Sequence, residues 1–209
     1  MKKGCYMNRT VENIYSRGAE IAFVLESPHI DEVFNAYPLA GSAGREMSKY
    51  IFSRSDIPFG LVAHKRELIC LLNISPVKPY SVINISRQPL QKTAYEANGI
   101  DLPTDIDLRE TLKRRIDQNA DYNTLHRDSK LNELKSEIYG DFKSECKNEL
   151  SRYKFIVPCG RFARTFCEHL LAESSLSCEL LKDIPHPSNG GWSSLESTKL
   201  DYIRQLLKE

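Results

Sequence analysis

One segment constrains the fold more than any other. Five consecutive apolar residues, Ile21 to Leu25, end directly in Glu26-Ser27-Pro28-His29. An apolar run without alternation is typical of a strand that is buried on both faces, as in parallel sheets. Pro28 cannot continue a hydrogen-bonded strand, so a turn is expected there. Polar residues at the carboxyl end of a central parallel strand usually face a ligand crevice, and a carboxylate such as Glu26 is costly there unless it is paired or functional.

Three further apolar runs predict the rest of the sheet. They cover Glu67 to Ile74, Tyr153 to Gly160 and Glu179 to Ile184. Helices are predicted for residues 8–17, 43–53, 107–119 and 128–150, after Gly160, and after the capping box Ser193-x-x-Glu196. Strands that alternate with helices predict an α/β fold, here a three-layer α/β/α sandwich with a central four-stranded parallel sheet. We expect one domain over residues 1–209, with an inserted loop and helical region at about 77–150.

The composition is that of an ordinary soluble globule, with 41% hydrophobic residues, 27% charged residues and a net charge of +1. This balance provides no overall basic field, so DNA binding would need a local patch. The six cysteines form no C-x-x-C pair, which predicts reduced thiols and neither a metal site nor a cofactor. No secretory signal and no apolar stretch of membrane-spanning length is present, which predicts a cytoplasmic protein without a membrane partner.

A glycine-containing segment follows the first predicted strand. In Pro38-Leu-Ala-Gly-Ser-Ala-Gly44, two glycines, Gly41 and Gly44, flank a predicted helix start, with Ser42 as the candidate N-cap. Glycine at such a place lets the polar edge of a ligand approach backbone N–H groups closely. The segment is therefore a candidate pocket wall.

Polar residues also end the other predicted strands. Asn73 ends the second, and His186-Pro187-Ser188 follows the fourth, just before Asn189-Gly-Gly-Trp192. Because the carboxyl ends of parallel strands lie along one edge of a sheet, we expect Glu26, Asn73 and His186 to meet around one slot.

Taken in order, these blocks resemble the uracil-DNA glycosylase superfamily. The resemblance covers roughly residues 20–192, apart from about 77–150. It rests on Glu26-Ser27-Pro28-His29, Pro38 to Gly44, Asn73, the turn at Cys159-Gly160 and His186-Pro187-Ser188. It implies a monofunctional hydrolase that excises a flipped uracil-like or modified base from single- or double-stranded DNA, without metal or cofactor.

The resemblance also implies roles for individual residues. Glu26 or Ser27 would position water, and His186 would stabilise the leaving base. Base-binding residues would be Asn73, Leu39, His29 and Pro28. The pocket and the groove for the DNA backbone would be lined by Gly41, Ser42, Ala43, Gly44, Ser188, Asn189 and Trp192, with the loop from Asn189 to Trp192 inserting at the lesion.

Three positions depart from the family pattern. Ser27 stands where the best-known members have a water-activating Asp, Leu39 where they usually have a base-stacking Phe, and His29 where some members have a Tyr. These departures, and the size of the region at 77–150, favour a bulkier modified base, as in chemically altered phage DNA. We expect a monomer.

Other interpretations stay open. A binding module of the same fold could recognise a nucleobase or nucleotide without cutting. An unrelated α/β hydrolase could use His186 with Ser27 or Ser188, although the chain has no Gly-x-Ser-x-Gly elbow.

Single residues also have simpler interpretations. Asn73 could be a turn residue and His186 a helix cap. Trp192 could fill the core instead of entering the base stack. Lys113-Arg114-Arg115 reads mainly as a solvated helix face, with a minor chance of phosphate contact.

Overall fold

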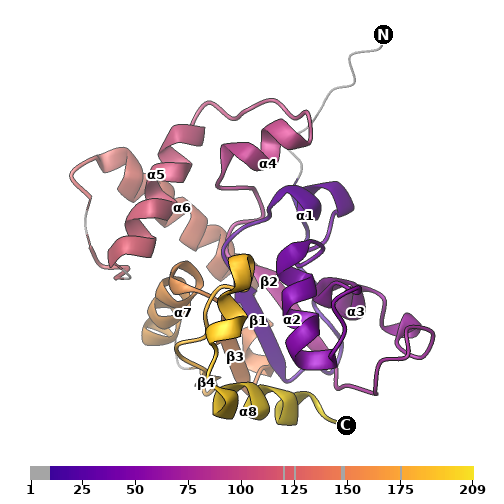
Figure 1. The fold of residues 1–209 in the computed structure, drawn as a ribbon. Coiled ribbons are helices and arrows are strands. Elements are labelled where there is room, and N and C mark those ends of the chain that lie inside the picture. Colours follow the sequence, from indigo (N-terminus) through magenta and orange to yellow (C-terminus); the bar gives the residue numbers. More distant parts are fainter. Residues whose placement is uncertain (1–9, 120, 125, 147–148, 175) are drawn as a thin grey trace.

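The sheet has four strands, all parallel, in the order β2-β1-β3-β4 (Figure 1). The computed structural model describes residues 10–209 except 120, 125, 147–148 and 175. The strands are β1 (Ile21–Leu25), β2 (Tyr80–Asn84), β3 (Phe155–Pro158) and β4 (Glu179–Leu180). Every residue of β1 is buried, as its unbroken apolar run predicts. The predicted four-stranded parallel sheet is confirmed.

Helices cover both faces of the sheet, because successive side chains of a strand point to opposite faces. Phe23 and Leu25 pack into one core with α2 (Ser42–Phe52), α3 (Phe59–His64) and α8 (Ser197–Leu207). Ala22 and Val24 pack into the other core with α5 (Ile106–Asn119), α6 (Ser129–Cys146) and α7 (Arg161–Glu173). The three-layer α/β/α sandwich is therefore confirmed. The shorter elements are α1 (Ile30–Asn35), α4 (Lys92–Ala97) and the 3-10 turns η1 (Arg66–Leu68), η2 (Leu150–Arg152) and η3 (Ser188–Ser194).

The prediction of a second strand at Glu67 to Ile74 is wrong. That segment forms η1 and a series of turns closed by short-range bonds such as Leu72 N–H to the Leu68 carbonyl, at 2.8 Å. Leu71 is 78% exposed, which a strand buried on both faces would not allow. The second strand is β2 instead, whose tyrosine, valine and isoleucine suit a pleated surface better than a leucine-rich run.

The position of β2 also changes the expectations for residues 10–17 and for the region at 77–150. Residues 10–17 of the predicted first helix are not helical: Ile14 makes an antiparallel bridge to Val82 and so covers the free edge of β2. The region at 77–150 is not a simple insertion, because it supplies strand β2 as well as α4, α5 and α6. Residues 8 and 9 lie outside the described residues.

Within the part of the chain that the structure describes, none of the helices has the length and apolar character needed to cross a membrane. Five cysteines there are free thiols: Cys70, Cys146, Cys159, Cys167 and Cys178. Cys5 lies outside the described residues.

Candidate active site

A cavity of about 580 Å³ lies where β1 and β3 end at their carboxyl sides. Its volume is in the range of about 300–1,000 Å³ that is typical of small-molecule sites. The loop after β1, the start of α2, the turn between β3 and α7, helix α5 and the loop before η3 form its walls. The lining residues are Leu25, Glu26, Ser27, His29, Asp31, Glu32, Gly41, Ser42, Ala43, Gln91, Lys113, Asp117, Cys159, Gly160, Arg161, Phe162, His186, Ser188 and Asn189.

Most of the predicted site residues meet here. Glu26 and His186, 160 positions apart in the printed sequence, line the same cavity. So do the other predicted residues Ser27, His29, Gly41, Ser42, Ala43, Ser188 and Asn189. The parallel sheet brings them together, because it places the carboxyl ends of β1 and β3 side by side.

Glu26 is held by a lysine that the sequence analysis treated as part of a solvated helix face. The Lys113 ammonium lies 3.0 Å from Glu26 Oε2 and 2.6 Å from Asp117 Oδ2. Burial raises the pKa of Glu26 to about 7, against the opposing effect of Lys113. Burial also disfavours the Lys113 ammonium, but Glu26 and Asp117 outweigh this effect and raise its pKa. The only sequence signal was the Lys113–Asp117 spacing of four beside the apolar stripe of α5.

His186 has a defined tautomer. The Ser188 backbone N–H donates to His186 Nδ1 at 3.2 Å, and the Ser188 hydroxyl lies 2.7 Å from the same atom. Since Nδ1 accepts, the ring proton of the neutral imidazole is on Nε2. Burial, helped by the Lys113 charge, lowers the pKa of His186 to about 4, so the ring is a neutral hydrogen-bond donor at pH 7.

Two glycines allow the His186 loop to pack tightly. Gly160 has φ of +95° and a Cβ there would lie 3.0 Å from the His186 Cβ. A Cβ on Gly191 would collide with the His186 carbonyl oxygen. Larger residues at either position would displace the imidazole from the cavity.

Two helices of more than ten residues begin at the cavity wall. The N-caps are Gly41 for α2 and Gly160 for α7, and neither has a side-chain cap among the described residues. Gly41, and not the predicted Ser42, is therefore the N-cap of α2. The first-turn N–H groups of a helix lack internal partners and carry a partial positive charge. Both helix starts favour negative charge that develops inside the cavity.

Glu32, which the sequence analysis missed, organises the loop after β1. Its Oε2 accepts the His29 backbone N–H at 2.7 Å, and its Oε1 accepts the Leu39 N–H. Burial raises the pKa of Glu32 to about 7, although the two backbone N–H groups oppose this. The spacing of three between His29 and Glu32, as in a capping box, was the available signal.

We expect Glu32 to make stability fall with rising pH. Its pKa is 4.5 in the unfolded chain and about 7 in the folded protein, so the contribution is complete below pH 4.5. Between pH 4.5 and pH 7 the unfolded chain releases the Glu32 proton while the folded protein keeps it. This difference favours the unfolded state and removes on the order of 3 kcal/mol of stability by the time the pH passes 7. Glu32→Gln should lose less stability than wild type between pH 5 and pH 8 in urea unfolding. The exposed control Glu137→Gln should follow wild type, and equal pH dependence in all three proteins would contradict this role.

Asn73 does not belong to the site. It is exposed, lies in a turn with φ of +52°, and is not among the cavity-lining residues. A different asparagine, Asn84, ends the true second strand and pairs in register with Leu25, next to Glu26. Asn84 is 1% exposed, and neither atom of its side-chain amide has a hydrogen-bond partner among the described residues. A buried amide without partners is costly, so its polar atoms call for a ligand or water.

Four other predicted contacts lie outside the cavity. Leu39 is fully buried in the core of α2 and α3, so it offers no stacking surface. Gly44 packs against the Leu39 carbonyl, where a Cβ would clash, and Pro28 is buried and is not among the cavity-lining residues. Trp192 is 1% exposed and donates from Nε1 to the Pro185 carbonyl at 3.0 Å, so it is a core residue and does not insert into DNA.

Comparison with known proteins adds no family to this picture. No model of a known protein family matches the sequence, and a search of curated proteins finds no match. The functional argument therefore rests on the side chains that the fold brings together. Among the described residues, no group of three His, Cys, Asp or Glu side chains is placed to hold a metal ion.

Proposed function

We propose that the protein is a monofunctional DNA glycosylase that hydrolyses the N-glycosidic bond of a flipped base. The observation that carries this proposal is that the Glu26 carboxylate and the neutral His186 imidazole line one cavity of nucleotide-accommodating size. The resemblance to uracil-DNA glycosylases supports it, as do the two helix N-termini in the wall, since the base departs as an anion.

In the proposed reaction, the bond between sugar C1′ and the base nitrogen breaks and its electron pair stays with the base. His186 donates its Nε2 proton as a hydrogen bond to the base oxygen that gains negative charge. A water molecule held by Glu26 attacks C1′ and passes a proton to the carboxylate. Ser27, whose hydroxyl lies 3.4 Å from Glu26 Oε1, supports the orientation of Glu26.

We assign base reading to Asn84 in place of Asn73. Asn84 is not itself among the cavity-lining residues, but it ends β2 beside the catalytic loop. Its buried amide has no partner among the described residues and can both donate and accept, as an edge of a pyrimidine or purine requires. Among the aromatic side chains of the cavity wall, the exposed His29 imidazole is available to contact the base in place of Leu39, whereas Phe162 is buried in the core. The volume and many polar residues of the cavity suit a uracil-like or modified base.

Lys113 should not act as a nucleophile, although it lies in the cavity. A lysine that forms a Schiff base with the sugar must lose its proton, but Glu26 and Asp117 hold it as an ammonium with a raised pKa. We therefore expect no covalent protein–DNA adduct when the reaction is run with sodium borohydride at pH 7.5. A trapped adduct that disappears in Lys113→Arg would contradict this.

A panel of oligonucleotides tests the proposed function. It carries uracil, hypoxanthine, xanthine, hydroxymethylcytosine or glucosylated hydroxymethylcytosine, in single and double strands. We expect alkali-labile abasic sites with at least one of these bases for wild type, and strongly reduced amounts for His186→Ala. Absence of product with every base, together with measurable binding, would favour a non-catalytic nucleobase-binding module, for which the replacement of the usual Asp by Ser27 is the supporting observation.

We also propose a cytoplasmic location. The five described cysteines are free, as is usual in a reducing compartment.

A further inference from the structure

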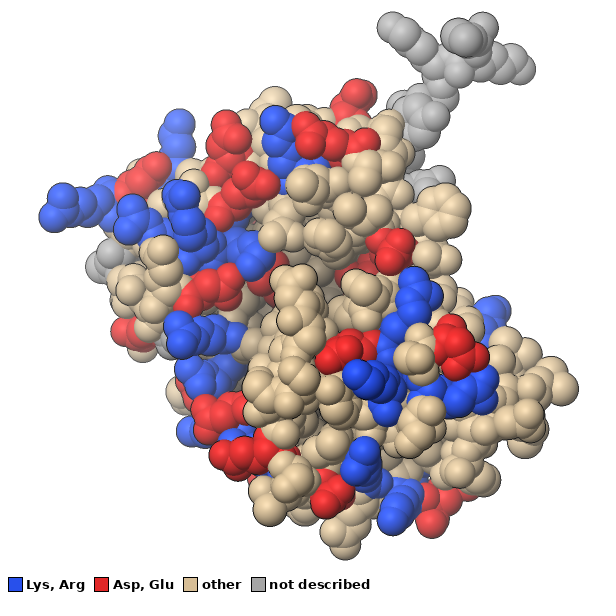
Figure 2. Space-filling model, viewed as in Figure 1, with Lys and Arg blue, Asp and Glu red and all other residues tan. Residues whose placement is uncertain are grey.

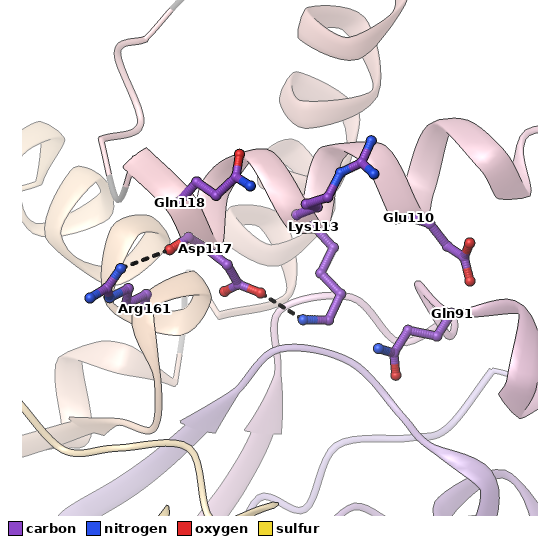
Figure 3. Close-up of a pocket in the computed structure, with 7 residues that line it drawn as sticks. Gln91, Glu110, Lys113, Asp117, Gln118 and Arg161 are labelled. Carbon is purple, nitrogen blue, oxygen red and sulfur yellow. Dashed lines mark hydrogen bonds and ion pairs between the residues drawn. The ribbon is translucent and has the colours of Figure 1, made fainter.

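A polar groove opens from the cavity along helix α5. It has a volume of about 530 Å³ and shares Gln91, Lys113, Asp117 and Arg161 with the cavity. Its other lining residues are Glu110, Arg114 and Gln118, and we call this surface the α5 groove. Figure 3 shows that Lys113 and Asp117 project from the same side of α5 into the groove. Arg161 of α7 lies at one end of the groove and Gln91 at the other.

The side chains of the α5 groove are unsuited to stacking a base. All seven are polar or charged, and none is aromatic. Asp117 is paired with the Lys113 ammonium, which it shares with Glu26, and the Glu110 carboxylate accepts the Lys92 backbone N–H. Within the described residues, neither Arg114 nor Arg161 has a carboxylate partner. These two guanidinium groups are therefore available to an anion.

Arg161 is also held in place. Its Nη1 donates to the Asp117 main-chain carbonyl at 3.1 Å, which fixes the guanidinium at the junction of cavity and groove. Guanidinium groups match phosphate geometry and remain charged at every physiological pH. Lys and Arg side chains are numerous on this flank of the molecule, where Figure 1 places α5 and α7, although Asp and Glu side chains lie between them (Figure 2).

A flipped nucleotide would bring its phosphates to the rim that the cavity shares with the α5 groove. A base that enters the cavity remains attached to its sugar, so both flanking phosphates come to the cavity mouth. We propose that the α5 groove holds the DNA backbone on one side of the flipped nucleotide, with Arg114 and Arg161 as phosphate contacts. This assignment rests on the excision function proposed above and gives helix α5 a direct part in DNA binding.

The test measures binding without catalysis. A fluorescein-labelled oligonucleotide carrying a tetrahydrofuran abasic analogue, which cannot be cleaved by a glycosylase, is titrated by anisotropy over a series of NaCl concentrations. The measured quantity is the salt slope, the slope of the logarithm of the binding constant against the logarithm of the NaCl concentration. For Arg114→Glu and Arg161→Glu, we expect weaker binding to every sequence and a salt slope smaller in magnitude by about 1 for each substitution. Arg161→Gln should give the same change in slope, without an added negative charge.

Arg17→Glu is the matched control. Arg17 is exposed just before β1, at the opposite end of the sheet from the cavity, so its salt slope should equal that of wild type. Unchanged slopes in the groove variants, with wild type still binding, would overturn the groove assignment and leave excision untouched. Lower slopes in a protein that makes no abasic product would support the groove and reject excision. A second duplex carrying glucosylated hydroxymethylcytosine is titrated in parallel. Unchanged slopes with the abasic analogue, together with weaker binding of the groove variants to the glucosylated duplex, would instead assign the groove to a substituent of the base.

Discussion

Glu26→Gln is expected to lower the rate of base excision about 10²–10⁴-fold, the usual contribution of a positioned general base. The substitution keeps the shape of the side chain but removes its ability to accept a proton from water. Lys113 retains Asp117 as a partner at 2.6 Å, so the variant should keep the fold. The measurement is single-turnover excision on the best base of the panel. Ser27→Ala is the matched control, with a much smaller expected loss.

The pH dependence of excision gives a second readout of Glu26. With a pKa of about 7, the wild-type carboxylate is protonated in acid, so the rate should fall as pH decreases below 7. His186, with a pKa of about 4, stays neutral over this range, so its titration adds no second change to the pH–rate profile. Lys113→Met should move the fall in rate to higher pH, because the lost ammonium stabilised the ionised form of Glu26. Lys113→Arg keeps a positive charge there and should leave the fall near its wild-type pH. A pH-independent wild-type rate between pH 5 and pH 8 would reject Glu26 as the base.

His186→Ala is expected to lower excision about 10²–10³-fold, or about 2.7–4 kcal/mol, as for other single donors to a developing oxyanion. The loss should be smaller for bases that leave more easily as anions, because these depend less on a donor. Ser188→Ala should have a modest effect, since the Ser188 backbone N–H still donates to Nδ1. Equal losses for good and poor leaving groups would show that His186 acts on structure and not on the departing base.

Two parts of the site, the loop after β1 and the loop that carries His186, could be predicted because their sequence signals are local. The apolar run of β1 and the polar residues that end it are adjacent in the chain, and the same is true of His186 and Ser188. An unbroken apolar run that stops at polar residues and a proline favours a buried strand followed by a turn, and for residues 21–28 the structure has this arrangement.

The second strand could not be chosen by the same rule. Leu71-Leu72-Asn73-Ile74-Ser75 and Val82-Ile83-Asn84-Ile85-Ser86 have nearly the same pattern, and periodicity cannot separate two short apolar runs. Pairing decided between them: β2 bonds to β1 along five residues, whereas the earlier segment closes on itself in turns. The position of the asparagine that we assign to base reading changed with it.

By itself, the sequence determined the α/β class, the strand that leads to Glu26 and the loop that carries His186. Each depends on residues that are neighbours in the chain. Only the tertiary structure decided that Lys113 pairs with Glu26, that Leu39 and Trp192 belong to the core, and that Asn84, not Asn73, ends the second strand. The physical reason is that burial and charge pairing depend on which distant segments pack together, and short apolar runs leave that choice to the whole fold.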